Sequence, residues 1–215
     1  MKSILLFLAL WLPWCLFAAP GITFMDGVTA VNLIDEVTGK QTIWITAGGM
    51  TPSFTAGSSN SVSVETTAGR PDMKVKDFDP STEEHAQFNV AFPKQWNLGT
   101  ITFQAYHTTA TGRTAGLDGV VWGLECLAIG ADESIDQAYG TEVVVGTDLA
   151  QTAEDVWVTA ESAAVTIVGT PADDDIVECQ VSRVVGSSTP LDDMDIDARL
   201  IGIKLFWTSD ALNDD

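Results

Sequence analysis

Two clusters of aspartates are the residues whose types and spacing best suit chemistry. Residues 173–175 are consecutive aspartates in a predicted turn, and Asp193, Asp195 and Asp197 alternate along a predicted extended segment. Alternation puts these three carboxylates on one side of the chain, and a calcium ion needs several such oxygens at about 2.3–2.6 Å. The three aspartates are therefore the calcium candidates of this sequence. Neither cluster has the glycine that calcium loops place at a fixed position, so we favour a solvated, charged loop that protects strand edges from aggregation.

Trp96 is the aromatic residue best placed to contact a ligand, because it lies in a turn that contains Pro93 and Asn97. An exposed indole in such a turn could stack on the apolar face of a sugar ring. Packing as a cap on one end of the fold is the role that we favour for Trp96. Trp122 lies inside a predicted strand beside Val121, and we expect it in the core.

Machinery for catalysis is not recognisable in the sequence. His85 and His107 lack metal-ligand spacing, and there is no Gly-rich phosphate loop and no Ser-centred nucleophile elbow. Adjacent carboxylates such as Glu83 and Glu84 could serve a glycosidase only at a set separation across a cleft, and adjacency means little among thirty acidic residues. The sequence therefore predicts a non-enzymatic protein without a cofactor, calcium being the one exception considered.

Three cysteines occur, and two of them fall inside predicted strands. Cys126 and Cys179 are surrounded by apolar residues, whereas Cys15 belongs to an apolar run near the start of the chain. We favour two buried free thiols that pack as small apolar side chains. A disulfide between Cys126 and Cys179 is the alternative, and it requires an oxidising compartment.

The charge of the chain restricts its partners. Thirty Asp and Glu against ten Lys and Arg give a formal net charge of −20. Such an excess repels phosphate backbones and anionic lipid, which excludes nucleic acid and acidic membranes as partners. It also favours solubility and suits a protein displayed on a surface in salty medium.

The first 24 residues form a separate problem. Lys2 followed by an apolar run to residue 19 is typical of a secretory signal, and the run is short for a transmembrane helix. The alternative is that translation begins at Met25 and that residues 1–24 are a mis-assigned start. We expect a mobile lead-in over residues 25–40, no stable membrane span in the mature domain, and a short acidic tail at residues 209–215.

Short alternating strands separated by turns fill the rest of the chain. Phe88 and Val90 fall on one face of a predicted strand, and Gln87 and Asn89 fall on the other. The same reasoning predicts strands at residues 41–46, 61–65, 87–92, 100–108, 119–129, 142–145, 155–159, 164–168, 175–185 and 198–208, with one or two helical turns only at residues 132–139.

A run of strands without intervening helices indicates packed antiparallel sheets. The predicted fold is all-β, a jelly-roll-like antiparallel β-sandwich of about eight to ten strands over residues 41–208. An immunoglobulin-like sandwich is the second choice, because the spacing of Cys126, Trp157 and Cys179 does not match its core signature.

Several phrases of the sequence resemble a group of uncharacterised bacteriophage proteins from marine and environmental tailed phages. The phrases are AGGMTP (residues 47–52), FPKQWNLGTITF (92–103), VWGL (121–124), GTPA (169–172) and DARLIGI (197–203), and they occur in the same order. The resemblance implies a virion structural protein with a jelly-roll-like fold: a head decoration, a head fibre or a tail-appendage subunit. No catalytic residues are attached to that group, so none is transferred to this chain.

We therefore expect a non-enzymatic phage structural protein on the virion surface. Its expected partners are copies of itself in a homo-oligomer, other virion proteins, and glycans on the host surface. The alternative is a secreted bacterial β-sandwich binding module or adhesin, which the signal-like run at residues 1–19 favours.

Overall fold

The computed structural model describes residues 23–26, 29–32, 39–110, 119–147, 154–188 and 190–211. The chain divides into two units, Met1–Val37 and Thr38–Asp215. In the first unit, β1 (Thr23–Asp26) pairs antiparallel with β2 (Thr29–Asn32), and β2 falls within the segment predicted as a lead-in. The signal-like run at residues 1–19 lies outside the described residues. Among the residues that are described, no helix is long and apolar enough to cross a membrane.

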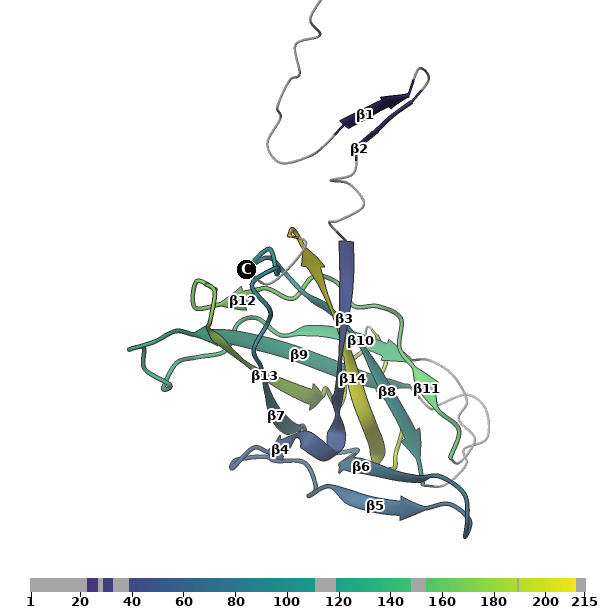
Figure 1. Ribbon diagram of the computed structural model, residues 1–215. Helices are drawn as coiled ribbons and strands as arrows, with labels where there is room; N and C mark the ends of the chain where they lie inside the picture. The colour runs from purple at the N-terminus through teal and green to yellow at the C-terminus, as the bar shows by residue number, and fades with distance from the viewer. Residues whose placement is uncertain are drawn as a thin grey trace, which may run out of the picture. The chain divides into compact units, whose positions relative to one another are not determined.

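The second unit contains a sheet built around its longest strand, β14 (Figure 1). One edge of β14 pairs with β8, and the other edge is shared by β3 and β6. We call this the β14 sheet. Its strands are β11 (Trp157–Val158), β8 (Thr102–Thr109), β14 (Ala198–Ser209), β3 (Gly39–Thr46), β6 (Asp72–Phe78) and β5 (Val62–Glu65).

The other sheet, which we call the β9 sheet, has the order β10-β9-β13-β7-β4. All of these neighbours are antiparallel, and the short β12 (Ile167–Val168) adds a parallel pair to β9. The bounds of its five main strands are β10 (Val143–Thr147), β9 (Val120–Ile129), β13 (Ile176–Arg183), β7 (Glu84–Val90) and β4 (Thr51–Pro52). A 3₁₀ turn, η1 (Ala47–Gly49), leads from β3 to β4.

The apolar core lies between the two sheets and follows from strand alternation. In β7, Ala86, Phe88 and Val90 are buried, while Gln87 and Asn89 point away from the core, as the sequence predicted. Trp122 is fully buried against Phe78, with ring centroids 5.1 Å apart in an edge-to-face arrangement. The predicted fold class is confirmed: the protein is an all-β, jelly-roll-like sandwich of two antiparallel sheets.

Local predictions failed in several places, among them strand β6 and residues 132–139. Strand β6 was not predicted, because its charged residues obscure the alternation of Met73 and Val75. One of these charges, Lys76, is buried and donates from its Nζ to the carbonyl oxygen of Ser59 at 3.0 Å. The helical turns predicted at residues 132–139 are absent, since this segment forms an exposed turn and irregular chain.

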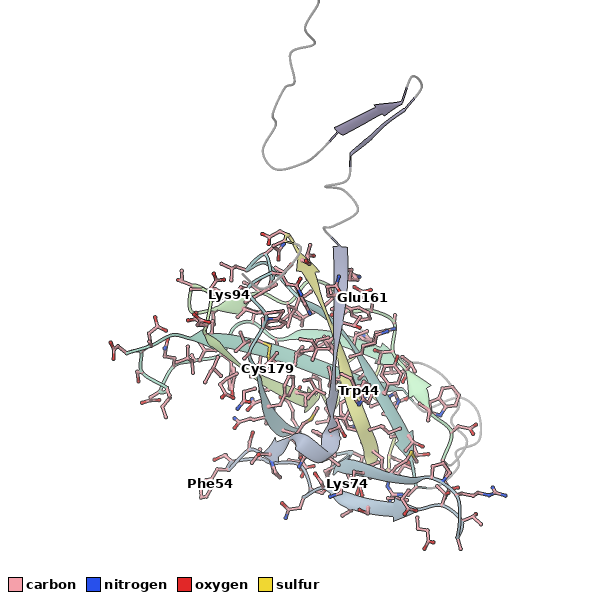
Figure 2. The ribbon with its side chains drawn as sticks, in the orientation of Figure 1. Trp44, Phe54, Lys74, Lys94, Glu161 and Cys179 are labelled. Atoms are coloured by element: carbon pink, nitrogen blue, oxygen red, sulfur yellow. A yellow bond between two sulfur atoms is a disulfide. The ribbon has the colours of Figure 1, made fainter. Side chains whose placement is uncertain are left out.

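The preference for free thiols was wrong. Cys126 on β9 and Cys179 on β13 lie directly opposite each other, with 4.2 Å between their Cα atoms, and they form a disulfide within the buried core (Figure 2). Sequence reasoning could not decide the pairing, because it depends on which strands become neighbours in the sheet. The cross-link joins the two central strands of the β9 sheet.

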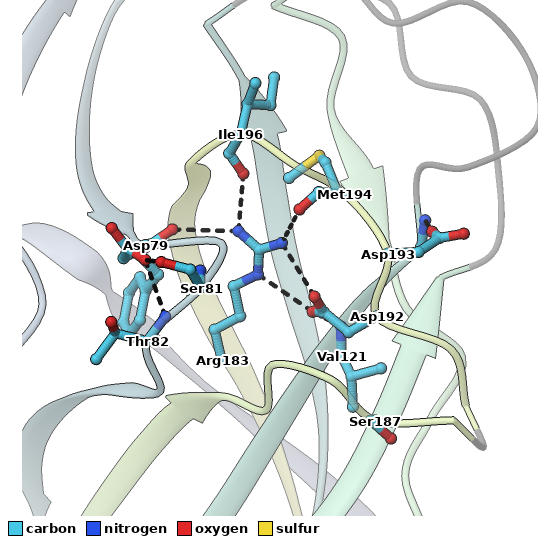
Figure 3. Close-up of polar contacts among 12 residues, drawn as sticks. Asp79, Ser81, Thr82, Val121, Arg183, Ser187, Asp192, Asp193, Met194 and Ile196 are labelled. Carbon is cyan, nitrogen blue, oxygen red and sulfur yellow. Dashed lines mark hydrogen bonds and ion pairs between the residues drawn. The ribbon is translucent and has the colours of Figure 1, made fainter.

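A buried ion pair holds one end of the sandwich (Figure 3). The Arg183 guanidinium bonds both carboxylate oxygens of Asp192 at 3.1 Å, and both side chains are almost completely buried. Its remaining N–H groups donate to the backbone carbonyl oxygens of Phe78, Met194 and Ile196, at 3.3, 2.5 and 2.8 Å. All five donors of the guanidinium are therefore used, which is the condition for burying this charge.

A second buried polar group lies in the core beside Trp122. The indole N–H of Trp122 donates to Nδ1 of His107 at 3.3 Å, so the proton of a neutral imidazole resides on Nε2, which lies 3.3 Å from Oγ1 of Thr147. Burial lowers the pKa of His107 to about 3, and the positive charge of Arg183 adds to this effect. His107 is therefore a neutral, structural residue at physiological pH.

We predict that removal of the disulfide by the double substitution Cys126→Ala and Cys179→Ala lowers the free energy of unfolding by about 2–5 kcal/mol. The reason is that the bridge spans 53 residues of sequence and limits the freedom of the unfolded chain. Denaturant titration measures the loss. Alkylation of the denatured chain should modify only Cys15 without reductant and all three cysteines with it. Modification of Cys126 or Cys179 without reductant would contradict the bridge.

A second prediction concerns the buried guanidinium. Substitution Arg183→Met leaves Asp192 charged and unpaired in the core, and we expect it to cost about 3–5 kcal/mol of unfolding free energy. The matched control is Arg199→Met, because Arg199 pairs with Asp77 at 3.0 Å where both side chains are partly exposed. The control should cost at most about 1 kcal/mol. Equal losses in the two variants would show that burial is not what makes the Arg183 pair important.

Candidate functional site

The outer face of the β9 sheet carries a chain of hydrogen-bonded polar side chains. Gln87 on β7, Gln180 on β13 and Glu125 on β9 lie opposite one another in register. The Gln87 amide donates to Oε1 of Gln180 at 3.0 Å, and the Gln180 amide donates to Oε1 of Glu125 at 2.9 Å. The Ser53 hydroxyl donates a further hydrogen bond to the same Gln180 oxygen at 3.0 Å. Three strands and one loop therefore present a single connected polar surface.

One step along the same strands, a second polar pair borders a groove. The Asn89 amide donates to Oε1 of Glu178 at 3.3 Å, and both residues line the groove together with Gln87. The groove has a volume of about 480 Å³ and lies between β3 of one sheet and β7 of the other. Its lining is completed by Trp44, Ile45, Thr46, Gly49, Thr51 and Phe88.

Trp44 is also among the lining residues, and its exposed ring lies on the outer face of the β14 sheet, over Gly202 and against Tyr106 (Figure 2). Its side chain is 49% exposed, and its ring meets the Tyr106 ring edge to face at a centroid distance of 5.0 Å. The ring passes over Gly202 of β14, where an added Cβ would lie only 2.5 Å from Cζ2 of Trp44. Glycine at this position thus permits the close approach that holds the indole in place.

Two carboxylates on the same outer face have altered acidity. Glu142 lies against the backbone of Gly123 and accepts a hydrogen bond from the Ser182 hydroxyl. Burial raises the pKa of Glu142 above its ordinary value of 4.5. Burial also raises the pKa of Glu125, and the neighbouring negative charge of Glu142 raises it further. Perturbed carboxylates of this kind gather at functional sites, so they support the assignment of this face as the candidate site.

Tyr139 extends the polar face towards the loop that follows β9. Burial raises the pKa of its phenol, and the negative charges of Glu178 and Glu125 contribute to the same shift. The groove and the polar chain adjoin at Gln87, which belongs to both.

The structure buries Trp96, which the sequence offered as a possible ligand contact although a capping role was favoured. Trp96 is only 4% exposed, and its ring stacks on Phe92 with 4.5 Å between centroids. Backbone bridges tie this turn to Ser209 at the end of β14. Trp96 therefore caps the sandwich, which is the role that its position in a turn also suggested, and it has no open ring face for a sugar.

The calcium candidates Asp193, Asp195 and Asp197 are not brought together as a metal site. Asp193 turns towards the protein and accepts a hydrogen bond from the backbone N–H of Gly119 at 2.8 Å. In the part of the chain that the structure describes, no group of three or more His, Cys, Asp or Glu side chains could hold a metal ion. The segment instead wraps around Arg183 through Asp192 and two backbone carbonyl groups, so its acidity serves the buried ion pair.

Sequence reasoning missed Trp44 as the exposed aromatic, although the signal was available. Trp44 alternates with Ile43 and Ile45 in the first predicted strand, and these two isoleucines pack against the core. A period of two therefore places Trp44 on the outer face. The proximity of β3 to β7, which creates the groove, had no signal in the sequence.

Comparisons with known proteins find similarity only at the level of structure. No family model and no curated protein matches the sequence. A family 11 carbohydrate-binding module from Clostridium thermocellum, solved with a mixed-linked tetrasaccharide, matches with 9% identity, a TM-score of 0.36, and coverage of 87% of this chain and 96% of that chain. A Stig cyclase, Fisc, from Fischerella sp. TAU matches with 11% identity, a TM-score of 0.40, and coverage of 78% and 85%.

A chain from the structure of infectious bursal disease virus, Gx strain, also matches, with 10% identity and a TM-score of 0.33. The match covers 88% of the present chain and 37% of the viral chain. The three matched proteins differ in their described activities, and likenesses of this degree do not assign a function.

The raised pKa of Glu142 generates a prediction for stability against pH. Above the raised pKa the carboxyl is charged in the folded protein, where burial disfavours the charge, so the residue lowers the free energy of unfolding. Below 4.5 it is neutral in both the folded and the unfolded chain, and the effect vanishes. We expect Glu142→Gln to raise the melting temperature at neutral pH and to leave it unchanged in acid.

Glu161→Gln is the matched control with the opposite sign. Hydrogen bonds from Lys40 and Thr102 lower the pKa of Glu161, so its contribution is present above 4.5 and is lost as the pH falls through the lowered value. This variant should therefore melt at a lower temperature than the parent at neutral pH, with the difference fading in acid. Melting temperatures of both variants, measured between acid and neutral pH, test these expectations. A shift of the melting temperature in the same direction for both variants at neutral pH would refute the opposite pKa shifts of Glu142 and Glu161.

Proposed function

We propose that this chain is a non-catalytic surface subunit of a phage virion and that its β-sandwich binds a ligand outside the particle. The groove beside Trp44 and the adjoining polar face are the observation that supports binding. The ordered phrases that resemble phage proteins support the virion role. The proposal includes assembly with copies of this chain and with other virion proteins.

The polar face favours binding over catalysis. Glu125 is engaged by Gln180, and Glu142 is engaged by Ser182, so each carboxylate with a raised pKa already serves a neighbour within the sheet. The face is built of side chains on paired strands, which hold a ligand-contacting surface more rigidly than loops would. Such an arrangement positions hydrogen-bonding groups without supplying a nucleophile.

Two further features support an external position. The Cys126–Cys179 disulfide is the kind of cross-link that persists in oxidising surroundings, which include virion and cell surfaces. The net charge of −20 favours a soluble surface that does not adhere to nucleic acid during packaging. Both features also suit the second candidate, a secreted bacterial binding module or adhesin, which the signal-like run at residues 1–19 specifically favours.

Immunogold labelling of intact particles distinguishes the two candidates. Antibody raised against the purified chain should label the outside of phage particles produced by the host in which the gene resides, without detergent treatment. Labelling confined to the bacterial surface or to spent medium would refute the virion role and favour the secreted module. Hydrolysis of any polysaccharide by the purified chain would refute the non-catalytic part of the proposal.

A further inference from the structure

We propose that two copies of this chain pair through the outer faces of their β14 sheets, related by a two-fold axis that passes near Trp44. This inference rests on the proposed function, because it names the surface by which copies of the subunit meet. The polar face of the β9 sheet lies on the opposite side of the core, so the contact leaves that face open to a ligand.

Apolar and aromatic side chains occupy the middle of the β14 face. Val158, Tyr106 and Gly202 lie opposite one another on β11, β8 and β14. The Trp44 ring lies over Gly202 and against Tyr106, which hold it in one orientation. Trp44 is 49% exposed and Val158 is 40% exposed. An exposed tryptophan that is already ordered loses little entropy on contact, and tryptophan is enriched at the centres of protein interfaces.

Towards the end of β14 the same face is cationic. The ammonium groups of Lys40 and Lys204 both lie over the Phe206 ring, at 4.9 and 5.0 Å from its centroid. Glu161 accepts a hydrogen bond from Lys40, so two cations face one carboxylate around this ring. The two ammonium groups therefore form a basic region on one side of the Trp44 indole.

The start of β14 carries the opposite charge. Four aspartates and one arginine line a cavity of about 450 Å³: Asp77, Asp79, Asp195, Asp197 and Arg199. Arg199 pairs with Asp77, which lies directly opposite on β6, at 3.0 Å. Burial raises the pKa of Asp197, and the negative charges of Asp77 and Asp79 raise it further. The cavity therefore has an excess of negative charge that an ammonium group would neutralise.

Both the cavity and the basic region open on the same side of the sheet. Arg199 alternates with two buried neighbours on β14, so its side chain points outward together with that of Asp77. Phe206 likewise lies between two core residues and points outward beneath the two ammonium groups. The outer face of the β14 sheet is thus acidic at one end, apolar in the middle and basic at the other end.

A two-fold axis perpendicular to the sheet brings unlike ends together, because it reverses the direction of β14 in the second copy. Phe206 lies four residues after Gly202, and Asp197 lies five residues before it. At about 3.3 Å per residue these offsets are about 13 and 17 Å. An axis near Trp44 therefore places the basic region of each copy over the acidic cavity of the other. The two indoles meet at the centre of the contact.

The charge of the rest of the molecule favours this contact over others between copies. Two chains of net charge −20 repel each other, so they approach where the charges cancel locally. Glu125, Glu142 and Glu178 lie on the outer side of the β9 sheet, and two such faces would add to the repulsion. An apolar centre with complementary charges around it is instead the usual arrangement of a protein interface.

Edge pairing through β3 is the competing contact between copies. Among the described strands, β3 pairs with β14 alone, so its other edge could add a strand from a second copy. That contact is made by backbone groups and does not bring Lys204 of one copy to Asp197 of the other. The two contacts therefore respond differently to reversal of these charges.

Light scattering of the full chain over a range of concentrations tests the proposal. We expect a monomer–dimer equilibrium. Lys204→Glu and Trp44→Ala should each raise the dissociation constant of the dimer by about tenfold or more, because a two-fold contact contains each change twice. The double substitution Lys204→Glu and Asp197→Lys should restore the dimer, since the reversed charges meet across the axis. Within one chain these positions are about 23 Å apart along the strand, too far to pair with each other.

Lys94→Glu is the matched control, because it makes the same change of charge beyond the end of β7 in the other sheet (Figure 2). It should dimerise as the parent does, and circular dichroism melts confirm that each variant is folded. Lys204→Glu keeps the test decisive if Trp44→Ala unfolds. A monomer at every concentration, growth beyond a dimer, parental dimerisation by folded Lys204→Glu, or no recovery in the folded double variant would each overturn the inference. Particle labelling is independent of these results, so failure here leaves the virion role standing.

Discussion

The buried guanidinium of Arg183 is the interaction on which the rest of the domain depends. A charge in an apolar core is tolerated only when its donors are bonded, and here Asp192 and three backbone carbonyl groups take all five. Arg183 ends β13 in one sheet, whereas Phe78 ends β6 in the other. One side chain therefore ties the two sheets together and holds β13, the strand that carries Gln180 of the polar face.

The polar face on the outer side of the β9 sheet also depends on hydrogen bonds between its side chains, here at the protein surface. Gln87, Gln180 and Glu125 are partly withdrawn from water, and each bonds the next across adjacent strands. Partial burial raises the pKa of both Glu125 and Glu142 above the ordinary value. The strands thereby set the directions of these polar groups.

The groove exists because edges of the two sheets come close without pairing. Trp44 and its neighbours on β3 form one wall, and Gln87 to Asn89 on β7 form the other. Gly202 lets the indole lie across β14 to reach Tyr106, so a glycine in the central strand of one sheet determines where the exposed ring stands.

Period-two alternation in the sequence determined the fold class and the faces of individual strands, as β7 illustrates with Phe88 inward and Gln87 outward. That signal is local, because neighbouring side chains on a strand must point to opposite sides. It also placed Trp122 in the core. Only the tertiary structure decided which strands are neighbours, and with them the Cys126–Cys179 bridge, the groove at Trp44 and the use of the acidic segment around Arg183. These contacts join residues far apart in the chain, and strand pairing leaves no trace in the spacing of either partner.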